Sequence, residues 1–244
     1  MKRRTHLLLT AGFLILLADE PAVAGPPYVT DDPQPTDLHH FEIYAFTLGT
    51  TTRDGSAGET GIDFNYGAAP DLQLTAVVPL GWSTPDGGAG LGNIELAAKY
   101  KFLHQEDVGV DVAFFPRVFL PAGSADAGER HVSLLLPLWI GHSWEHWSTF
   151  GGGGCVINHG DGGHNFCQLG WAVTNQVTSD LQLGAEIYHA TADTVGGRAT
   201  TGIGAGAIYD LTENYHLLAS IGPGIENAAQ TNQTSWYIAL LATF

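Results

Sequence analysis

Eight charged side chains fall within stretches of the sequence that otherwise alternate between apolar and small or polar residues. They are Glu42, Asp63, Glu95, Lys99, Lys101, Asp111, Arg117 and Glu186. All eight occupy the polar phase of the alternation, so in a sheet they would face the same side. Two kinds of site use such a set: a polar constriction that selects solutes, and a salt-bridged plug that fills an enclosed space. The charge pattern alone leaves both open.

A second group of candidate residues lies between Cys155 and Cys167, the two cysteines of the chain. His159, Asp161 and His164 stand there in a glycine-rich run, and histidine and carboxylate side chains bind divalent metals. Their spacing matches no established ligand pattern, so they are weak metal candidates and no metal site is predicted. We expect an exposed loop closed by a Cys155–Cys167 disulfide, because an exported chain meets an oxidising compartment.

No catalytic site is predicted. Some membrane barrels are enzymes that use a serine–histidine pair. Here His216 and Ser220 share one expected strand four residues apart, which is roughly 13 Å along a strand and beyond hydrogen-bond reach. We therefore expect a protein that is not an enzyme and needs no cofactor.

Aromatic residues also occur in the polar phase: Tyr44, Phe46, Phe115 and Tyr188. In a pore they could stack against an aromatic solute. The alternative is that they fill space inside an enclosed sheet.

The elements that must position these residues are strands. Alternating runs separated by turns predict twelve of them, near 40–50, 58–67, 72–82, 92–103, 108–119, 131–141, 147–157, 165–176, 181–190, 200–209, 215–224 and 235–244. Each is close to the 9–11 residues or so that a tilted strand needs to cross a bilayer. The apolar phase, represented by Leu74, Leu96 and Leu183, is expected to face lipid. Prolines at 79, 116 and 137 fall within these strands, where proline indicates an interruption or weak pairing.

The connections predict a barrel with two different ends. Tight turns alternate with longer segments around 51–57, 83–91, 120–130, 158–164, 191–199 and 225–234, as short periplasmic turns alternate with outer loops in membrane barrels. Aromatic residues gather near strand ends, as membrane interfaces require. The prediction is an all-β fold, a transmembrane antiparallel up-and-down β-barrel of about twelve strands, with ten or fourteen as alternatives. A soluble barrel would turn its apolar residues inward.

Composition and the N-terminal residues agree with export. Residues 1–24 carry a basic start, an apolar run of about 11 residues and a small-residue ending, which predicts a signal peptide rather than a spanning helix. Charged residues make up only 14% of the chain, against about 25% in soluble domains. Lys and Arg number 9 against 25 Asp and Glu, which disfavours nucleic acid as a partner.

The final strand alternates through Trp236, Ile238, Leu240 and Ala242 to Phe244. An aromatic end to an alternating strand is expected to stop at the membrane interface and to be read by barrel-insertion machinery. The predicted organisation is therefore a signal peptide at 1–24, a periplasmic segment at 25–39 and a barrel at 40–244. The predicted location is the outer membrane of a Gram-negative bacterium, with its lipid as a partner.

Several segments resemble one family of outer-membrane proteins. They are residues 28–33 (YVTDDP), 41–44 (FEIY), 92–102 (GNIELAAKYKF), 202–224 and 236–244. The sequence is similar to the family called putative MetA-pathway of phenol degradation, a transporter-like group. The resemblance implies a barrel that passes hydrophobic or aromatic compounds, and it supplies no site residues. The cysteine pair departs from the family pattern.

The expected function is a passive channel or transporter for small hydrophobic or aromatic molecules. Two alternatives stay open: a structural or surface-interaction barrel with a plugged lumen, and a lipid-modifying enzyme. An open path past the charged residues would distinguish the channel from the plug.

Overall fold

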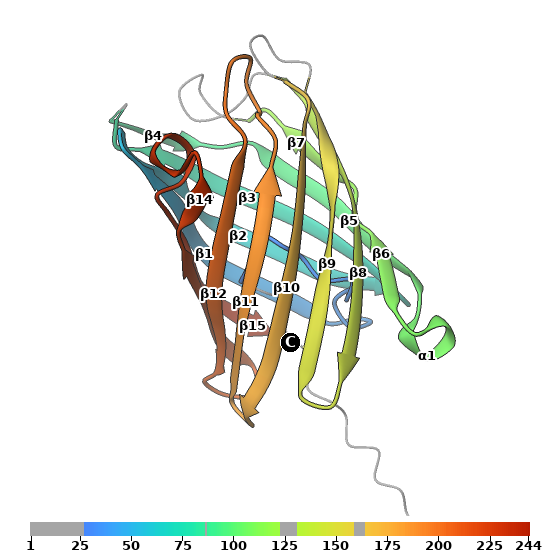
Figure 1. Ribbon diagram of the computed structural model, residues 1–244. Coiled ribbons are helices and arrows are strands. Elements are labelled where there is room, and N and C mark those ends of the chain that lie inside the picture. The colour runs from blue at the N-terminus through green and yellow to red at the C-terminus, as the bar shows by residue number, and fades with distance from the viewer. Residues whose placement is uncertain (1–26, 86, 123–130, 159–163) are drawn as a thin grey trace, which may run out of the picture.

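The computed structural model describes residues 27–85, 87–122, 131–158 and 164–244. Fifteen strands form one antiparallel sheet that curves around into a barrel (Figure 1). The sheet closes because β1 pairs with both β2 and β15. No helix in the described ranges is long and apolar enough to cross a membrane. The predicted signal peptide at 1–24 lies outside the described residues and stays a prediction.

The strands follow the predicted pattern closely, and two short helices that were not predicted lie in the connections. The elements are β1 (Phe41–Thr52), β2 (Gly55–Ala69), β3 (Leu72–Ser83), β4 (Gly88–Leu91), β5 (Ile94–Leu103), α1 (Gln105–Val108), β6 (Asp111–Phe114), β7 (Arg117–Leu120), β8 (Ser133–Trp144), β9 (Trp147–Asn158), β10 (Phe166–Thr178), β11 (Leu181–Ala190), β12 (Thr200–Asp210), β13 (Tyr215–Gly222), β14 (Gly224–Glu226), α2 (Ala228–Thr231) and β15 (Thr234–Thr243).

Twelve strands cross the barrel, which confirms the predicted number. Three crossing strands are each interrupted once, so fifteen segments less three interruptions give twelve. The breaks lie between β4 and β5, between β6 and β7, and between β13 and β14. Neighbouring strands follow one another around the barrel in chain order, which is the up-and-down arrangement.

The prolines lie at or opposite breaks in the strands. For Pro79 and Pro137 the break is in the neighbouring strand and not, as predicted, in the strand that contains the proline. Pro79 and Pro137 lie inside unbroken strands, β3 and β8, so the expected interruption of their own strands is wrong. Each lies opposite a break in the neighbouring strand. The Pro79 carbonyl accepts a hydrogen bond from Gly92 N, and the Pro137 carbonyl accepts one from Phe115 N. A proline cannot donate to the ladder, so the break falls in the strand that faces it.

The two faces of the wall differ as the alternation predicts. Leu74, Leu96 and Leu183 are 47%, 46% and 44% exposed on the outside. Their strand neighbours in the other phase, such as Gln73 and Lys99, are buried inside. An apolar outer face and a polar interior are the arrangement of a membrane barrel. The soluble alternative, with apolar residues turned inward, is excluded by this orientation.

The connection between β1 and β2 corrects one predicted loop. A longer segment was expected at 51–57, but β1 continues to Thr52 and β2 begins at Gly55. Only Arg53 and Asp54 connect them, with Gly55 at φ 143°. Polar residues at 51–57 look like a loop in sequence, yet Thr51 and Ser56 pair across the hairpin through their hydroxyl groups. Strand residues above the membrane face water on both sides, so hydropathy does not distinguish them from a loop.

Aromatic side chains ring both ends of the barrel. At the short-turn end Phe41 stacks on Tyr66 with ring centroids 4.6 Å apart, and at the other end Trp82 stacks on Trp236 at 6.2 Å. Within the barrel, β1, β12, β13 and β15 contribute a buried apolar cluster that includes Phe46, Leu218 and Leu241. The interior is therefore partly filled by the side chains of its own wall.

Candidate functional site

All eight charged residues predicted for the lumen lie on the inner face of the wall. Glu42, Lys99, Asp111 and Glu186 are buried, and the other four are partly buried. Arg117 on β7 lies 3.6 Å from Glu95 on β5. Lys101 on β5 lies 3.9 Å from Asp111 on β6. Seven of the eight thus lie on one side of the barrel, on β1, β2, β5, β6 and β7, whereas Glu186 lies apart from them on β11.

Residues 27–36, which we name the lumen segment, lie inside the barrel. Residues 25–39 were predicted to lie in the periplasm. The structure differs from this prediction at residues 27–36. In Figure 1 the chain before β1 passes between the strands of the two sides of the barrel. Thr30, Asp32 and Thr36 are all buried there. The segment has no alternating pattern, so the sequence carries no signal for its place.

One carboxylate ties the lumen segment to the wall at β5 and β7. Asp31 Oδ1 accepts a hydrogen bond from Lys99 Nζ at 3.0 Å, and its Oδ2 accepts one from Arg117 Nη2 at 2.7 Å. The two cations flank the Phe115 ring, with Lys99 Nζ 4.8 Å and Arg117 Cζ 4.2 Å from its centroid. A cation over an aromatic face is attracted by the ring quadrupole. Lys99 and Arg117 are therefore already engaged.

A second tie reaches the other side of the barrel at β11. The buried Glu186 carboxylate accepts hydrogen bonds from Val29 N at 3.1 Å, from Thr30 N at 3.1 Å and from Thr30 Oγ1 at 2.9 Å. Going around the ring of twelve strands, β11 lies five strands beyond β5. The lumen segment is consequently held from nearly opposite walls and lies across the lumen.

Two glycines on the inner face make room for this segment. A Cβ at Gly170 would lie 2.1 Å from Thr30 Oγ1, and a Cβ at Gly206 would lie 2.5 Å from Tyr28 Cε1. Both approaches are closer than van der Waals contact permits. Glycine is the residue that allows such a close approach, so this side of the wall is shaped to receive the segment.

Amide side chains complete the contact between segment and wall. Gln34 Nε2 donates to Asp111 Oδ2 at 2.7 Å, and Gln34 Oε1 accepts from Lys101 Nζ at 2.9 Å. Further along, Thr36 N donates to the Gln73 Oε1 atom at 2.8 Å. Buried polar groups need such partners because an unmade hydrogen bond is costly.

The two aspartates of the lumen segment have different proton affinities. Burial would raise the pKa of Asp31, but Lys99 and Arg117 outweigh it and hold the pKa of this carboxyl below its usual value. Burial raises the pKa of Asp32 to about 6; Lys99 lowers it and the neighbouring Asp31 raises it. Asp31 therefore stays ionised in mildly acidic solution, whereas Asp32 takes up a proton.

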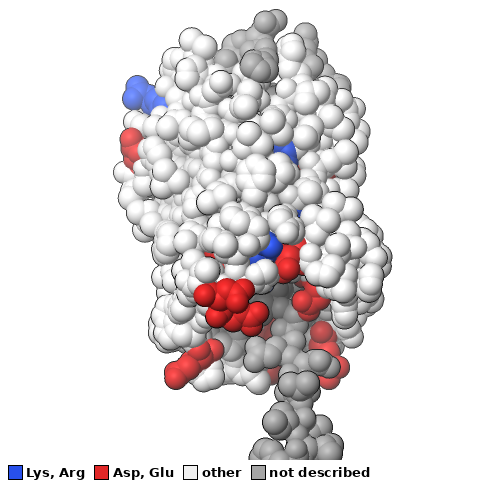
Figure 2. Space-filling model, turned by 90° about the vertical axis from the view of Figure 1, so that its right-hand side faces the viewer, with Lys and Arg blue, Asp and Glu red and all other residues white. Residues whose placement is uncertain are grey.

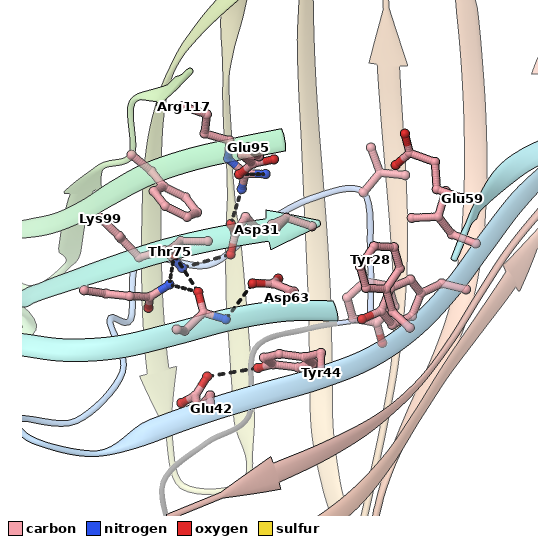
Figure 3. Close-up of a pocket in the computed structure, with 18 of the residues that line it drawn as sticks. Tyr28, Asp31, Glu42, Tyr44, Glu59, Asp63, Thr75, Glu95, Lys99 and Arg117 are labelled. Atoms are coloured by element: carbon pink, nitrogen blue, oxygen red, sulfur yellow. Dashed lines mark hydrogen bonds and ion pairs between the residues drawn. The ribbon is translucent and has the colours of Figure 1, made fainter. Parts of the chain in front are cut away.

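A cavity of about 260 Å³ remains beside the lumen segment. Its lining combines carboxylates, amides and aromatic rings from β1, β2, β3, β5, β7 and β15 with Tyr28 and Asp31 of the segment. Figure 3 shows Glu42, Asp63, Glu95 and Tyr44 around this space. Tyr44, Phe46 and Phe115 line the cavity, so they point inward as predicted. Tyr188, the fourth aromatic residue predicted to point inward, is buried on β11.

The cysteine pair forms the predicted disulfide. Cys155 and Cys167 lie directly opposite each other on β9 and β10 and are bonded. Of the weak metal candidates, His159 and Asp161 lie outside the described residues. His164 contacts the carbonyl oxygen of Asn165 through Nδ1 at 2.6 Å. In the described ranges no cluster of three histidine, cysteine or acidic side chains is arranged to hold a metal.

Several site residues were not predicted. Asp63 on β2 was predicted, but Glu59, which shares its face four residues earlier and lines the same cavity, was not. Asp31 was not predicted either, although residues 28–33 belong to a segment that resembles the family. Two adjacent aspartates in a short segment between the expected signal peptide and the barrel were the available signal. Their partners, Lys99 and Arg117, are known only once the barrel is closed.

Comparisons with solved structures identify the same architecture. The outer membrane channel from Pseudomonas putida F1 is 14% identical, with a TM-score of 0.69, covering 87% of this chain and 98% of that one. The KdgM porin is 13% identical, with a TM-score of 0.58 and coverage of 83% and 99%. The NanC porin is 10% identical, with a TM-score of 0.60 and coverage of 83% and 98%. A comparison with curated proteins gave no match.

The sequence also matches a family profile over nearly its whole length. The profile aligns with residues 18–241, a range that includes the lumen segment and all but the last residues of β15. The predicted resemblance is thereby confirmed. The chain is an outer-membrane β-barrel that belongs to the family described as "Putative MetA-pathway of phenol degradation".

Proposed function

We propose that this barrel is a passive conduit for small hydrophobic or aromatic compounds across the outer membrane of a Gram-negative bacterium. The observation that carries the proposal is the cavity of about 260 Å³ inside the barrel, which is lined by both aromatic rings and polar groups. Ligand sites combine apolar walls with a few polar groups in this way. The described lumen offers no serine–histidine pair, and transport down a gradient needs no cofactor.

The lumen segment controls passage in this proposal. It lies between Glu186 on one wall and Lys99 and Arg117 on the other. A solute that enters the cavity from one end must pass this segment to leave by the other. Movement of the segment away from either wall would widen the path. The similar P. putida channel is consistent with a transport role, and the family name with aromatic solutes.

A plugged structural barrel is the second candidate, and the same segment favours it. If the ties to both walls hold permanently, the lumen stays closed and only the exterior and the loops contact partners. The two candidates differ in whether charged aromatic molecules cross the purified barrel. Lipid itself is a barrier to permanent charge, so such molecules report on the lumen alone.

Proteoliposomes provide the test. Purified protein is reconstituted, and uptake of benzyltrimethylammonium and of benzenesulfonate is compared with protein-free vesicles. The conduit predicts that at least one of these ions enters faster through the barrel. Uptake of neither ion above the protein-free rate would contradict the conduit and support the plugged barrel.

A further inference from the structure

The cavity beside the lumen segment contains more carboxylates than basic groups. Lys99 and Arg117 contribute the positive charge, and both are engaged by Asp31, with Glu95 as a further partner of Arg117. Glu42, Glu59 and Asp63 line the same cavity. Within the described ranges none of these three forms an ion pair. The space is therefore bordered by a set of paired charges and by three acidic side chains that have no cationic partner among the described residues.

The surroundings of the three carboxylates make this excess unfavourable. Glu42 is only 8% exposed, and its Oε2 accepts a hydrogen bond from the neutral Tyr44 hydroxyl at 3.0 Å. Asp63 accepts one from Asn65 Nδ2 at 2.9 Å. The Glu59 carboxyl group has no hydrogen bond or ion pair with the described residues. Buried charges are normally paired, because removing them from water is expensive. A bound cation would stabilise the ionised form of these carboxyl groups.

The aromatic walls restrict what kind of cation fits. Phe46 and Tyr237 stack with centroids 6.4 Å apart and an interplanar angle of 11°, and both line the cavity together with Tyr44. Lys99 and Arg117 already make cation–π contacts with the Phe115 ring. Cations therefore lie against an aromatic ring elsewhere in this lumen. Ammonium groups with an apolar body are recognised by aromatic faces combined with negative charge. A bare metal ion would leave these rings unused.

We propose that the cavity is a binding site for small organic ammonium ions, with Glu42, Glu59 and Asp63 supplying charge and Tyr44, Phe46 and Tyr237 supplying apolar contact. The inference rests on the proposed conduit and narrows its solutes to aromatic or alkyl compounds that carry positive charge. An anion is a poorer occupant. It would have to displace Asp31 from both cations and then lie beside three acidic side chains.

The negative charge at the short-turn end of the barrel also favours cationic solutes. The turns there carry Asp71, Glu106, Asp107, Glu145 and Asp180 and include no Lys or Arg. Figure 2 shows the acidic side chains gathered at this end. Clefts lined by one sign of charge raise the local concentration of the opposite ion. The short-turn end of the barrel and the cavity therefore favour the same class of solute, small cations.

Isothermal titration calorimetry on the purified full-length barrel in detergent tests the site directly. Benzyltrimethylammonium is expected to bind saturably, and benzenesulfonate, of similar size and opposite charge, is expected to bind at least about tenfold more weakly. The double variant Glu59→Gln/Asp63→Asn should weaken binding of the cation by about tenfold or more. The matched control, Asp54→Asn/Asp193→Asn, removes two charges from exposed positions in the connections at the opposite end of the barrel and should leave binding unchanged.

Three outcomes would overturn the proposed ammonium site. They are no binding of the cation, equal binding of both ions, and an equal loss of affinity in the double variant and its control. Heat-modifiable migration on gels verifies that the variants are folded, and the single variant Glu59→Gln replaces the double one if that fails. Proteoliposome uptake separates the two proposals. Cation binding without uptake of either ion contradicts the conduit alone, and uptake without preference for the cation contradicts the site alone.

Discussion

Asp31 connects the lumen segment to two strands, because each of its carboxylate oxygens accepts a hydrogen bond from one cation. Lys99 is almost fully buried, whereas the Arg117 side chain is 23% exposed and keeps Glu95 as a partner. Removing one partner of a buried ion pair leaves the other charge uncompensated. At the scale of single residues, the position of the lumen segment therefore depends on this carboxylate more than on the neutral contacts around it.

Replacing Asp31 by Asn should loosen the lumen segment. Both cations lose the Asp31 carboxylate and keep only the longer contacts, Lys99 with Asp32 at 3.8 Å and Arg117 with Glu95 at 3.6 Å. The cost is up to about 3 kcal/mol, which corresponds to a shift of up to about a hundredfold in the equilibrium between the held and the released segment. Single-channel recordings in planar bilayers should show a larger mean conductance than the wild-type barrel. The matched control is Asp37→Asn, an exposed position six residues further on, and it should conduct like the wild type. Equal conductance in all three proteins would contradict this role of Asp31.

Asp32 makes the lumen segment sensitive to pH. Burial raises the pKa of this carboxyl to about 6, and Lys99, Asp31 and Lys101 are the charged groups that act on it. An acid whose pKa is raised in the held state is stabilised there by protonation, so this contribution is fully present below the usual value of about 3.9 and is lost as pH rises through about 6. Mean conductance should therefore be higher at pH 7.5 than at pH 5. Asp32→Asn should reduce that difference, and an unchanged difference in the variant would show that other groups cause it.

Strands were the most predictable elements, for a physical reason. A wall with lipid on one side and a polar interior on the other must alternate, so residues such as Leu74 and Gln73 reveal both the strand and its direction. The short hairpin of β1 and β2 was not predictable, because beyond the membrane neither face needs to be apolar. The breaks opposite Pro79 and Pro137 depend on which strands are neighbours, and a single strand's sequence does not contain that information.

The β9–β10 hairpin gives a prediction at this scale. Cys155 and Cys167 are direct partners in the ladder, and they close a loop with a sequence separation of 12. Replacing both by Ser should lower the free energy of unfolding by roughly 3 kcal/mol, mainly because the unfolded chain gains freedom. Urea titration in lipid vesicles, monitored by tryptophan fluorescence, measures this loss. The wild type under reducing conditions should match the variant, and an unchanged midpoint in both would contradict the prediction.

The whole molecule combines an apolar exterior, an acidic interior and a segment that lies across the lumen. The barrel, its lipid-facing side and the inner position of eight charged residues followed from the sequence. The place of residues 27–36 did not, because it depends on two opposite walls that come together only in the closed barrel. Glu186 and Lys99 are far apart in sequence, and neither indicates that a segment near the N-terminus connects them.

The central claim is that solutes cross through the lumen and that the lumen segment controls their passage. A covalent lock tests it most directly. A Cβ at Gly170 would lie 3.2 Å from Thr30 Cβ, close to the separation of about 3.5–4.5 Å that a disulfide needs. The variant Thr30→Cys/Gly170→Cys should therefore tie the segment to β10. The wild type under the same reductant controls for loss of the Cys155–Cys167 bond.

Uptake of benzyltrimethylammonium into proteoliposomes is then measured before and after reduction. The account predicts that the oxidised variant takes up the ion no faster than protein-free vesicles, and that reduction restores uptake while the wild type conducts in both states. Equal uptake by the locked and the reduced variant would contradict control by the lumen segment, and uptake of neither this ion nor benzenesulfonate by the wild type would contradict the conduit.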